Sequence, residues 1–172
     1  KNIKVVGGAV RSALRSEVTN DLDLAVNLRP LQVKELLQRF NIKFKDKSKG
    51  HGTVSILSKT EKIEITSLRR DIKTDGRNAV IEFTDRFEED SRRRDFTVNS
   101  IYSDYEGELY DPNNGKKDLE NNLIKFIGNP ENRIREDYLR ILRYFRMLGS
   151  YSSNELEIDN ESLAACVKNF GK

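Results

Sequence analysis

Cysteine, histidine and proline are scarce in this sequence. The 172 residues include one cysteine, Cys166, one histidine and three prolines. A single cysteine excludes an intramolecular disulfide and is typical of a reducing compartment. One histidine and one cysteine also argue against a zinc site with the usual nitrogen and sulfur ligands. A bound metal ion would therefore have oxygen ligands, which favours magnesium.

Long apolar runs are also missing. No stretch approaches the roughly 20 apolar residues that a membrane-spanning helix needs, and no signal-peptide pattern is present. Hydrophobic residues make up 36% of the chain and charged residues 34%, a composition typical of a soluble globular domain. The net charge of +3 permits a nucleic-acid partner without demonstrating one. Because both ends lie close to predicted elements, we expect these residues to belong to a larger whole.

Hydrophobic periodicity predicts a mixed first part and a helical second part. Strands are predicted at 3–6, 21–26, 51–57 and 61–68, with a hairpin around 104–107. Helices are predicted to begin after the glycine turn at Gly7 and Gly8 and at Pro30, and to cover 85–96, 130–149 and 161–170. A break near Glu136 and Asp137 is left open, and 71–79 and 111–119 have the composition of loops. This order predicts an α+β head over 1–125 and a helical region over 126–172.

The glycines of "VVGGAVR", Gly7 and Gly8, separate a predicted strand from a predicted helix. Glycines at this point let backbone N–H groups approach an anion, and the helix N-terminus adds a favourable field. Arg11 would supply a guanidinium for phosphate. Taken alone, an ordinary turn is the commoner explanation of such a pair.

Three carboxylates lie on two predicted strands. Asp21 and Asp23 in "NDLDLAVN" are two residues apart, so they share a strand face with Cα atoms roughly 6.5–7 Å apart. They are suited to one or two divalent cations and repel each other without them. A solvated strand face is equally consistent with the pair. Glu64, opposite the apolar face of its strand, is a third candidate, although an ion pair with Lys62 would also explain it.

The arginines of "SRRRDFTVNS" form a dense cluster. Arg92, Arg93 and Arg94 precede Asp95, and Asn99 follows four residues later. A run of arginines usually forms a solvated face. It also suits a triphosphate, because a guanidinium binds phosphate in a bidentate manner.

The predicted helix "EDYLRILRYFR" carries charged residues at steps of three. In a helix each step rotates the position by about 60°, so Asp137 and Arg140 are neighbours while Arg146 points elsewhere, roughly 13 Å along the axis. The apolar residues of the opposite face are Ile141, Leu142, Phe145 and Leu148. This is either an amphipathic helix with a surface ion pair worth a few tenths of a kcal/mol, or an acceptor–donor pair for a nucleobase edge.

These motifs occur in a specific order: "VGGAVR", "DLDLA", "HGTV", "IEITSLR", "SRRRDFTVNS", "DPNNGKKDL" and "REDYLRILRYFR". Together, over residues 3–150, they closely resemble the class II tRNA nucleotidyltransferases (CCA-adding enzymes) and the related bacterial poly(A) polymerases. "TDGRNAVIEFT" and "EDYLRILRYFR" look most like the alphaproteobacterial and mitochondrial branch. The resemblance implies a polymerase-beta-like nucleotidyltransferase head with a mixed β-sheet flanked by helices, then an all-helical neck. We expect the family's C-terminal helical domains to be absent from these residues.

The resemblance also implies roles for single residues. Asp21 and Asp23 would be the catalytic magnesium ligands, with Glu64 as the third acidic position. The implied nucleotide-binding positions are Gly7, Gly8, Arg11, Arg94, Asp137, Arg140, Arg143 and Arg146. Among these, Asp137 and Arg140 would read the base of CTP or ATP, and the helix geometry makes Arg146 the least suited to direct contact. Asp95 and Asn99 would support the site, and 71–79 would be a loop that influences the final A addition.

The implied reaction is attack of an RNA 3′-OH on the α-phosphate of CTP or ATP, with pyrophosphate release and Mg²⁺ as cofactor. The expected RNA is tRNA, and RNA-binding helices would come from a second chain or a C-terminal domain. A poly(A) polymerase, or a non-catalytic nucleotide- or RNA-binding subunit, are the alternatives. The family usually has an aspartate where this chain has Ser12. The expected location is the bacterial cytoplasm or, in a eukaryote, the mitochondrial matrix.

Overall fold

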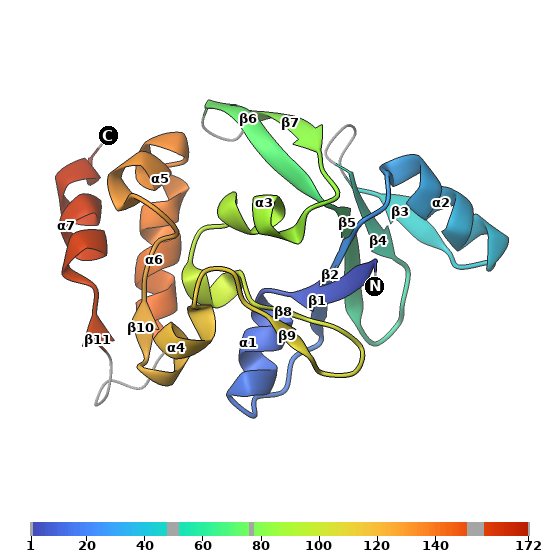
Figure 1. The fold of residues 1–172 in the computed structure, drawn as a ribbon, viewed down its shortest axis with the longest axis horizontal. Coiled ribbons are helices and arrows are strands. Elements are labelled where there is room, and N and C mark those ends of the chain that lie inside the picture. The colour runs from blue at the N-terminus through green and yellow to red at the C-terminus, as the bar shows by residue number, and fades with distance from the viewer. Residues whose placement is uncertain (1, 48–51, 76–77, 151–156, 172) are drawn as a thin grey trace.

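The main sheet of the protein has seven strands in the order β3-β4-β5-β2-β1-β8-β9 (Figure 1). The computed structural model describes residues 2–47, 52–75, 78–150 and 157–171. The strands of the sheet are β1 (Ile3–Val6), β2 (Asp21–Val26), β3 (Phe44–Asp46), β4 (Thr53–Ile56), β5 (Lys62–Ser67), β8 (Tyr102–Ser103) and β9 (Leu109–Tyr110). β2 and β5 run parallel and the other neighbours run antiparallel, which confirms the predicted mixed sheet.

The helices flank this sheet and then form a separate layer. They are α1 (Gly8–Leu14), α2 (Pro30–Arg39), α3 (Phe87–Arg92), the 3₁₀ helix η1 (Thr97–Asn99), α4 (Gly115–Glu120), α5 (Pro130–Glu136), α6 (Leu139–Gly149) and α7 (Asn160–Asn169). In Figure 1 the helices α5, α6 and α7 pack together at the end of the molecule opposite α2. The structure settles the break that the sequence left open, because α5 ends at Glu136 and α6 begins at Leu139. No helix among the described residues has the length and apolarity to cross a membrane.

The largest hydrophobic core joins the end of the sheet region to the helices that follow it. Phe96 contacts Phe126 and Tyr144, with ring centroids 4.9 and 6.1 Å apart, and all three side chains are fully buried. Ile134 of α5 and Cys166 of α7 belong to the same core. A second core packs α2 on the sheet. The predicted boundary at residue 125 therefore crosses a continuous core, and the division into 1–125 and 126–172 stays a prediction.

Some local predictions are wrong. Residues 71–79 lie in a hairpin of β6 (Arg69–Asp75) and β7 (Asn78–Phe83), whose tip at 76–77 lies outside the described residues. This hairpin is a two-stranded sheet separate from the main sheet. Its strands therefore do not need the alternation of apolar and polar residues that marks a strand with one buried face. The segment predicted as a loop at 111–119 overlaps with α4, which begins at Gly115, and Leu142 and Phe145 of α6 are exposed. The short strands β10 (Leu123–Ile124) and β11 (Glu157–Ile158) pair in parallel.

Candidate active site

Strand register brings the predicted carboxylates together on one face of the sheet. Asp23 of β2 lies opposite Glu64 of β5 and opposite Val6 at the end of β1, while Asp21 lies opposite Lys62. Residues directly opposite each other on paired strands point to the same face. These three acids, of which Glu64 is 43 residues from Asp21 in sequence, therefore form one group, the acid cluster Asp21, Asp23 and Glu64.

Two lysines partly neutralise the acid cluster. Lys62 Nζ lies 3.0 Å from both carboxylate oxygens of Asp21 and 3.4 Å from Glu64 Oε1. Lys47 Nζ also donates to Glu64 Oε1. Asp23 has no such lysine contact within hydrogen-bond distance among the described residues, so its charge is compensated least.

The electrostatics of Asp23 reflect that arrangement. Burial raises the pKa of Asp23 above its usual range, and the neighbouring charges of Asp21 and Glu64 raise it further, against the opposing effects of Arg94 and Lys62. A divalent cation beside Asp21 and Asp23 would relieve this repulsion, so the donor set suits a hard cation such as Mg²⁺. Within the described ranges, no three acidic, histidine or cysteine side chains converge closely enough to hold one ion. The predicted role of Glu64 as a third ligand stays a prediction.

The glycine turn lies at the same edge of the sheet. Gly7 has φ 75° and ψ −130°, a conformation that favours glycine, and it precedes the first residue of α1. A Cβ atom on Gly7 would lie 3.7 Å from the carbonyl oxygen of Asn99 and 3.8 Å from Arg94 Nη1. Val6, the last residue of β1, is paired with Asp23, so the glycine turn begins beside the acid cluster. The same turn borders Arg94.

A hydrogen-bonded chain links α1, η1 and α6. Arg11 donates to the side-chain oxygen of Asn99, and Asn99 Nδ2 donates to Asp95 Oδ1 at 3.1 Å. From α6, Arg143 Nε and Nη2 donate to Asp95 Oδ2 at 2.8 and 2.5 Å. Burial alone would raise the pKa of Asp95, but Arg143 and Asn99 outweigh it and lower that pKa. Asp95 therefore stays ionised and holds Arg143 next to the site.

Arg94 is fixed by a buried carboxylate. Arg94 Nη2 lies 3.1 Å from Asp90 Oδ2, and Tyr102 donates its hydroxyl to the same oxygen at 2.8 Å. Arg93 Nε donates to the other oxygen, Oδ1, at 2.9 Å. Asp90 is only 1% exposed. Its burial would raise its pKa, yet the charges of Arg93 and Arg94 outweigh that effect and lower the pKa of Asp90 to about 2.

The arginines of α5 and α6 contact the head through backbone carbonyls. Arg133 Nη2 donates to the carbonyl oxygens of Arg93 and Arg94 at 2.6 and 2.7 Å. Arg140 Nη1 donates to the carbonyl oxygen of Arg133 at 2.8 Å and to Glu136 Oε2 at 2.6 Å. Arg140 Nη2 also lies 3.5 Å from the carbonyl oxygen of Arg93, so its guanidinium, only 9% exposed, links α6 to the arginine cluster.

The expectation that Asp137 and Arg140 are neighbours on one helix is wrong, because Asp137 lies outside the helix that carries Arg140. Asp137 has extended backbone, with φ −158° and ψ 105°, and lies between α5 and α6. Its carboxylate accepts a hydrogen bond from the backbone N–H of Leu139 at 3.1 Å. Arg146 is exposed and has no side-chain hydrogen bond or ion pair with any described residue. The structure thus brings Arg143, but not Arg146, into contact with the predicted site residues.

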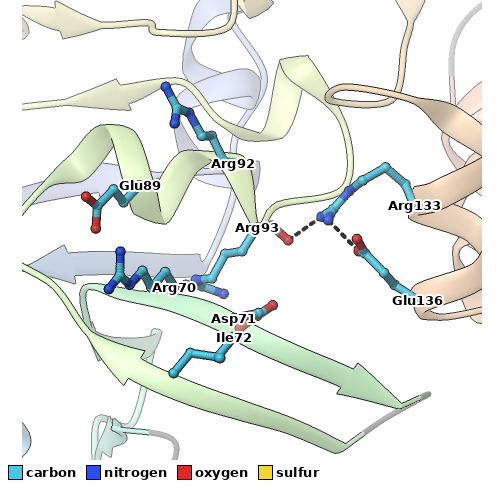
Figure 2. Close-up of a pocket in the computed structure, with 8 residues that line it drawn as sticks. All are labelled: Arg70, Asp71, Ile72, Glu89, Arg92, Arg93, Arg133 and Glu136. Carbon is cyan, nitrogen blue, oxygen red and sulfur yellow. Dashed lines mark hydrogen bonds and ion pairs between the residues drawn. The ribbon is translucent and has the colours of Figure 1, made fainter.

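A cavity of about 350 Å³ lies between β6, α3 and α5, beside the arginine cluster (Figure 2). Its lining residues are Arg70, Asp71, Ile72, Glu89, Arg92, Arg93, Arg133 and Glu136. Figure 2 shows Arg133 reaching from α5 toward Glu136 and the carbonyl oxygen of Arg93. The acid cluster does not line this cavity.

Sequence reasoning missed three residues that organise the site: Asp90, Tyr102 and Arg133. Asp90 had a signal, because it precedes Arg93 and Arg94 by three and four residues on a predicted helix, the spacing at which side chains meet. Tyr102 and Arg133 had none, since their partners lie 12 and about 40 residues away.

Known proteins are similar to this chain in both sequence and fold. The family described as "Poly A polymerase head domain" matches residues 3–125. The "CCA tRNA nucleotidyltransferase 1, mitochondrial" of Mus musculus is 41% identical over 168 residues, which cover 97% of this chain and 39% of that protein. The "CCA-adding enzyme" of Bacillus subtilis is 37% identical over 145 residues, covering 83% of this chain and 36% of that protein.

A solved structure gives the same result. The crystal structure of Bacillus stearothermophilus CCA-adding enzyme in complex with CTP superposes with a TM-score of 0.82 and 32% sequence identity. The match covers 97% of this chain and 39% of that one. The chain thus spans about two fifths of the length of the relatives that it matches.

Proposed function

Because the chain belongs to the poly(A) polymerase head-domain family, we propose that it is the catalytic part of an RNA 3′-end nucleotidyltransferase that adds CMP and AMP to tRNA. The names of its relatives, a mitochondrial CCA tRNA nucleotidyltransferase and bacterial CCA-adding enzymes, support tRNA as the substrate. The observation that carries the proposal is the acid cluster at the end of the glycine turn, with Arg94 beside it.

In this proposal Asp21 and Asp23 bind Mg²⁺, and Glu64 is the weaker candidate for a third ligand. Mg²⁺ at such a site supplies a lowered pKa for an attacking hydroxyl and stabilises charge on phosphate oxygens. The raised pKa of Asp23 supports this assignment, since burial, and after it the charges of Asp21 and Glu64, disfavour an ionised Asp23 in the absence of a cation. Lys62, which contacts Asp21, must move aside when a cation binds there.

The basic side of the site binds the triphosphate. Arg94 and Arg11 both border the glycine turn, since a Cβ atom on Gly7 would lie 3.8 Å from Arg94 Nη1 and one on Gly8 would lie 3.8 Å from Arg11 Nη2. Their positive charge and hydrogen-bond donors suit phosphate oxygens. Because Asp90 holds Arg94 before any ligand arrives, little side-chain ordering is needed when the nucleotide binds.

Base selection falls to the junction of α5 and α6. Asp137 offers carboxylate oxygens at this junction and Arg140 offers guanidinium N–H groups, which together are able to pair with the edge of a base. Arg140 is already engaged by Arg133 and Glu136, so it presents its remaining donors from a fixed position. Arg143, held by Asp95, is the next candidate along α6.

The test is incubation of this chain with Mg²⁺, each labelled nucleoside triphosphate in turn, and tRNAs that end before, within and after CCA. We expect CMP and AMP to be added only to the incomplete ends, and the variants Asp21→Asn and Asp23→Asn to add neither. Asp85→Asn, an exposed acid outside the site, is the matched control and should behave like the wild type.

Two other results would assign a different function. Long A-tails on any RNA, without incorporation of C, would identify a poly(A) polymerase, the alternative that the name of the matching family favours. Nucleotide binding without transfer, with transfer restored by a second polypeptide, would identify a subunit that needs a partner for its RNA-binding helices.

A further inference from the structure

The short helix α4 packs unusually closely against η1. A Cβ atom on Gly115, the first residue of α4, would lie 2.1 Å from the carbonyl oxygen of Thr97 and 3.0 Å from the side chain of Ile101. Any residue larger than glycine would therefore force the two backbones apart. The approach is stabilised from the other side by Asp111, whose carboxylate accepts hydrogen bonds from the backbone N–H groups of Gly115 and Lys116 at 2.8 Å each.

Side chains of this segment also hold η1 directly. Thr97 donates its hydroxyl to Asp118 Oδ2 at 2.6 Å. Asn113 Nδ2 donates to the hydroxyl oxygen of Ser100 at 2.9 Å, and that hydroxyl donates to the carbonyl oxygen of Thr97 at 2.8 Å. Thr97 and Ser100 are buried, so these groups have few alternative partners in water.

The opposite side of η1 belongs to the candidate active site. Asn99, between Thr97 and Ser100, accepts a hydrogen bond from Arg11 and donates one to Asp95. Its carbonyl oxygen borders the glycine turn at Gly7. One three-residue helix thus contacts α4 on one side and Arg11, Asp95 and the glycine turn on the other.

We propose that Thr97 and Asp118 are positioning residues: they fix the orientation of η1, and η1 in turn fixes Asn99 and Arg11 for nucleotide binding. The inference rests on the proposed function. It assigns a task to "DPNNGKKDL", a motif that has no contact with the acid cluster among the described residues.

Loss of the bond between Thr97 and Asp118 should affect nucleotide binding but not cation binding. Without the bond to Asp118, η1 and Arg11 have more freedom, and that freedom must be lost when a triphosphate binds. Asp21 and Asp23 lie on β2 and are held by its pairing with β1 and β5, and among the described residues no hydrogen bond or ion pair joins α4 to these strands. Nucleotide affinity should therefore fall while the affinity of the acids for a divalent cation is retained.

The experiment compares Thr97→Val with Thr97→Ser in this chain. Valine has nearly the shape of threonine but lacks the hydroxyl, whereas serine keeps it. Asp118→Leu and Asp118→Asn form a second pair, because asparagine keeps an acceptor for the hydroxyl. Glu120→Gln removes an exposed charge from the same helix without contacting η1, and is the matched control. The readouts are CTP affinity by calorimetry, Mn²⁺ affinity by electron paramagnetic resonance, and the thermal midpoint.

We expect Thr97→Val and Asp118→Leu to weaken CTP binding about tenfold and to leave Mn²⁺ affinity within about twofold of wild type. Thr97→Ser and Asp118→Asn should keep the CTP affinity close to that of wild type. Unchanged CTP affinity in Thr97→Val would overturn the inference. So would a parallel loss of CTP and Mn²⁺ affinity that follows the thermal midpoint, because that indicates general loosening of the fold. A wild-type chain that does not bind CTP would instead refute the proposed function.

Discussion

The acid cluster and the arginine cluster lie on two sides of one site and are stabilised in opposite ways. On the acidic side, burial and like charges raise the pKa of Asp23. On the basic side, Arg93 and Arg94 overcome the burial of Asp90 and lower its pKa to about 2. One carboxylate thus carries a charge that the protein does not fully compensate, while the other is compensated completely. Asp23 is therefore available to an added cation, whereas Asp90 stabilises the fold.

The two clusters also differ in what holds their residues in place, which is strand pairing for the acids and side-chain bonds for Arg94. Asp21 and Asp23 depend on the pairing of β2 with β1 and β5 for their placement. Arg94, by contrast, is held by its ion pair with Asp90 and by the contacts of Arg133 with the local carbonyl groups. Changes on the acidic side should therefore affect activity without loss of stability, and changes around Asp90 should affect both.

The largest effect is expected on the acidic side. Asp21→Asn or Asp23→Asn should lower nucleotide transfer at least about a thousandfold, because the loss of a carboxylate removes the charge that binds the cation. The urea midpoint should stay the same or rise, since the substitution removes repulsion within the cluster. Single-turnover transfer and urea unfolding measure the two effects. A marked loss of stability would show that these acids also hold the fold together.

The basic side should respond with a loss of stability. Asp90→Asn leaves Arg93 and Arg94 without their buried carboxylate, so the free energy of unfolding should fall by about 3 kcal/mol. CTP affinity should fall with it, because Arg94 loses its anchor. Urea denaturation and calorimetry measure both. Glu88→Gln, which removes an exposed partner of Arg86 and Arg92, is the control and should cost much less. Equal losses in the two variants would contradict the distinction.

The pH dependence follows from the lowered pKa of Asp90. Because the folded-state pKa lies below the unfolded value, ionised Asp90 stabilises the fold above about pH 4, and this contribution is lost as the pH falls toward 2. The contribution is about 2 kcal/mol. The difference in unfolding free energy between wild type and Asp90→Asn should therefore shrink below pH 4. A difference that stays constant down to pH 2 would assign the effect to packing.

A smaller effect is expected from Lys62. Its ammonium group lies 3.0 Å from Asp21 and competes with a cation for that carboxylate. Lys62→Met should therefore tighten Mn²⁺ binding about fivefold, while Lys59→Met, an exposed lysine outside the cluster, should not. Electron paramagnetic resonance titration measures both variants. Weaker binding in Lys62→Met would mean that Lys62 organises the acids rather than competing at them.

The sequence was most informative where one element carries the whole pattern. The period-two alternation of 20–27 predicted that Asp21 and Asp23 share a face, and β2 confirms the strand. The same local reasoning failed for α4, because its preceding residue Asn114 is left-handed and Asp111 supplies the hydrogen bonds to its first turn. The composition of that stretch is that of a loop, although it folds as a helix.

Long-range contacts account for what could not be predicted. Nothing local indicates that Arg140 bonds to the carbonyl of Arg133 or that Arg133 reaches the carbonyls of Arg93 and Arg94. The sequence left a break between α5 and α6 open, and it did not indicate the extended backbone of Asp137 at that break. Sequence pattern thus located the charged residues, and tertiary packing decided which of them are free to meet a ligand.

The most direct test of the central claim is the affinity of this chain for CTP, measured by calorimetry with Mg²⁺ and with EDTA. We expect wild type to bind CTP at least about tenfold more tightly with Mg²⁺, because the cation links the triphosphate to Asp21 and Asp23. The double variant Asp21→Asn/Asp23→Asn should bind CTP equally in both conditions. Wild-type binding that is the same in Mg²⁺ and EDTA would contradict the assignment of the acid cluster as a cation site.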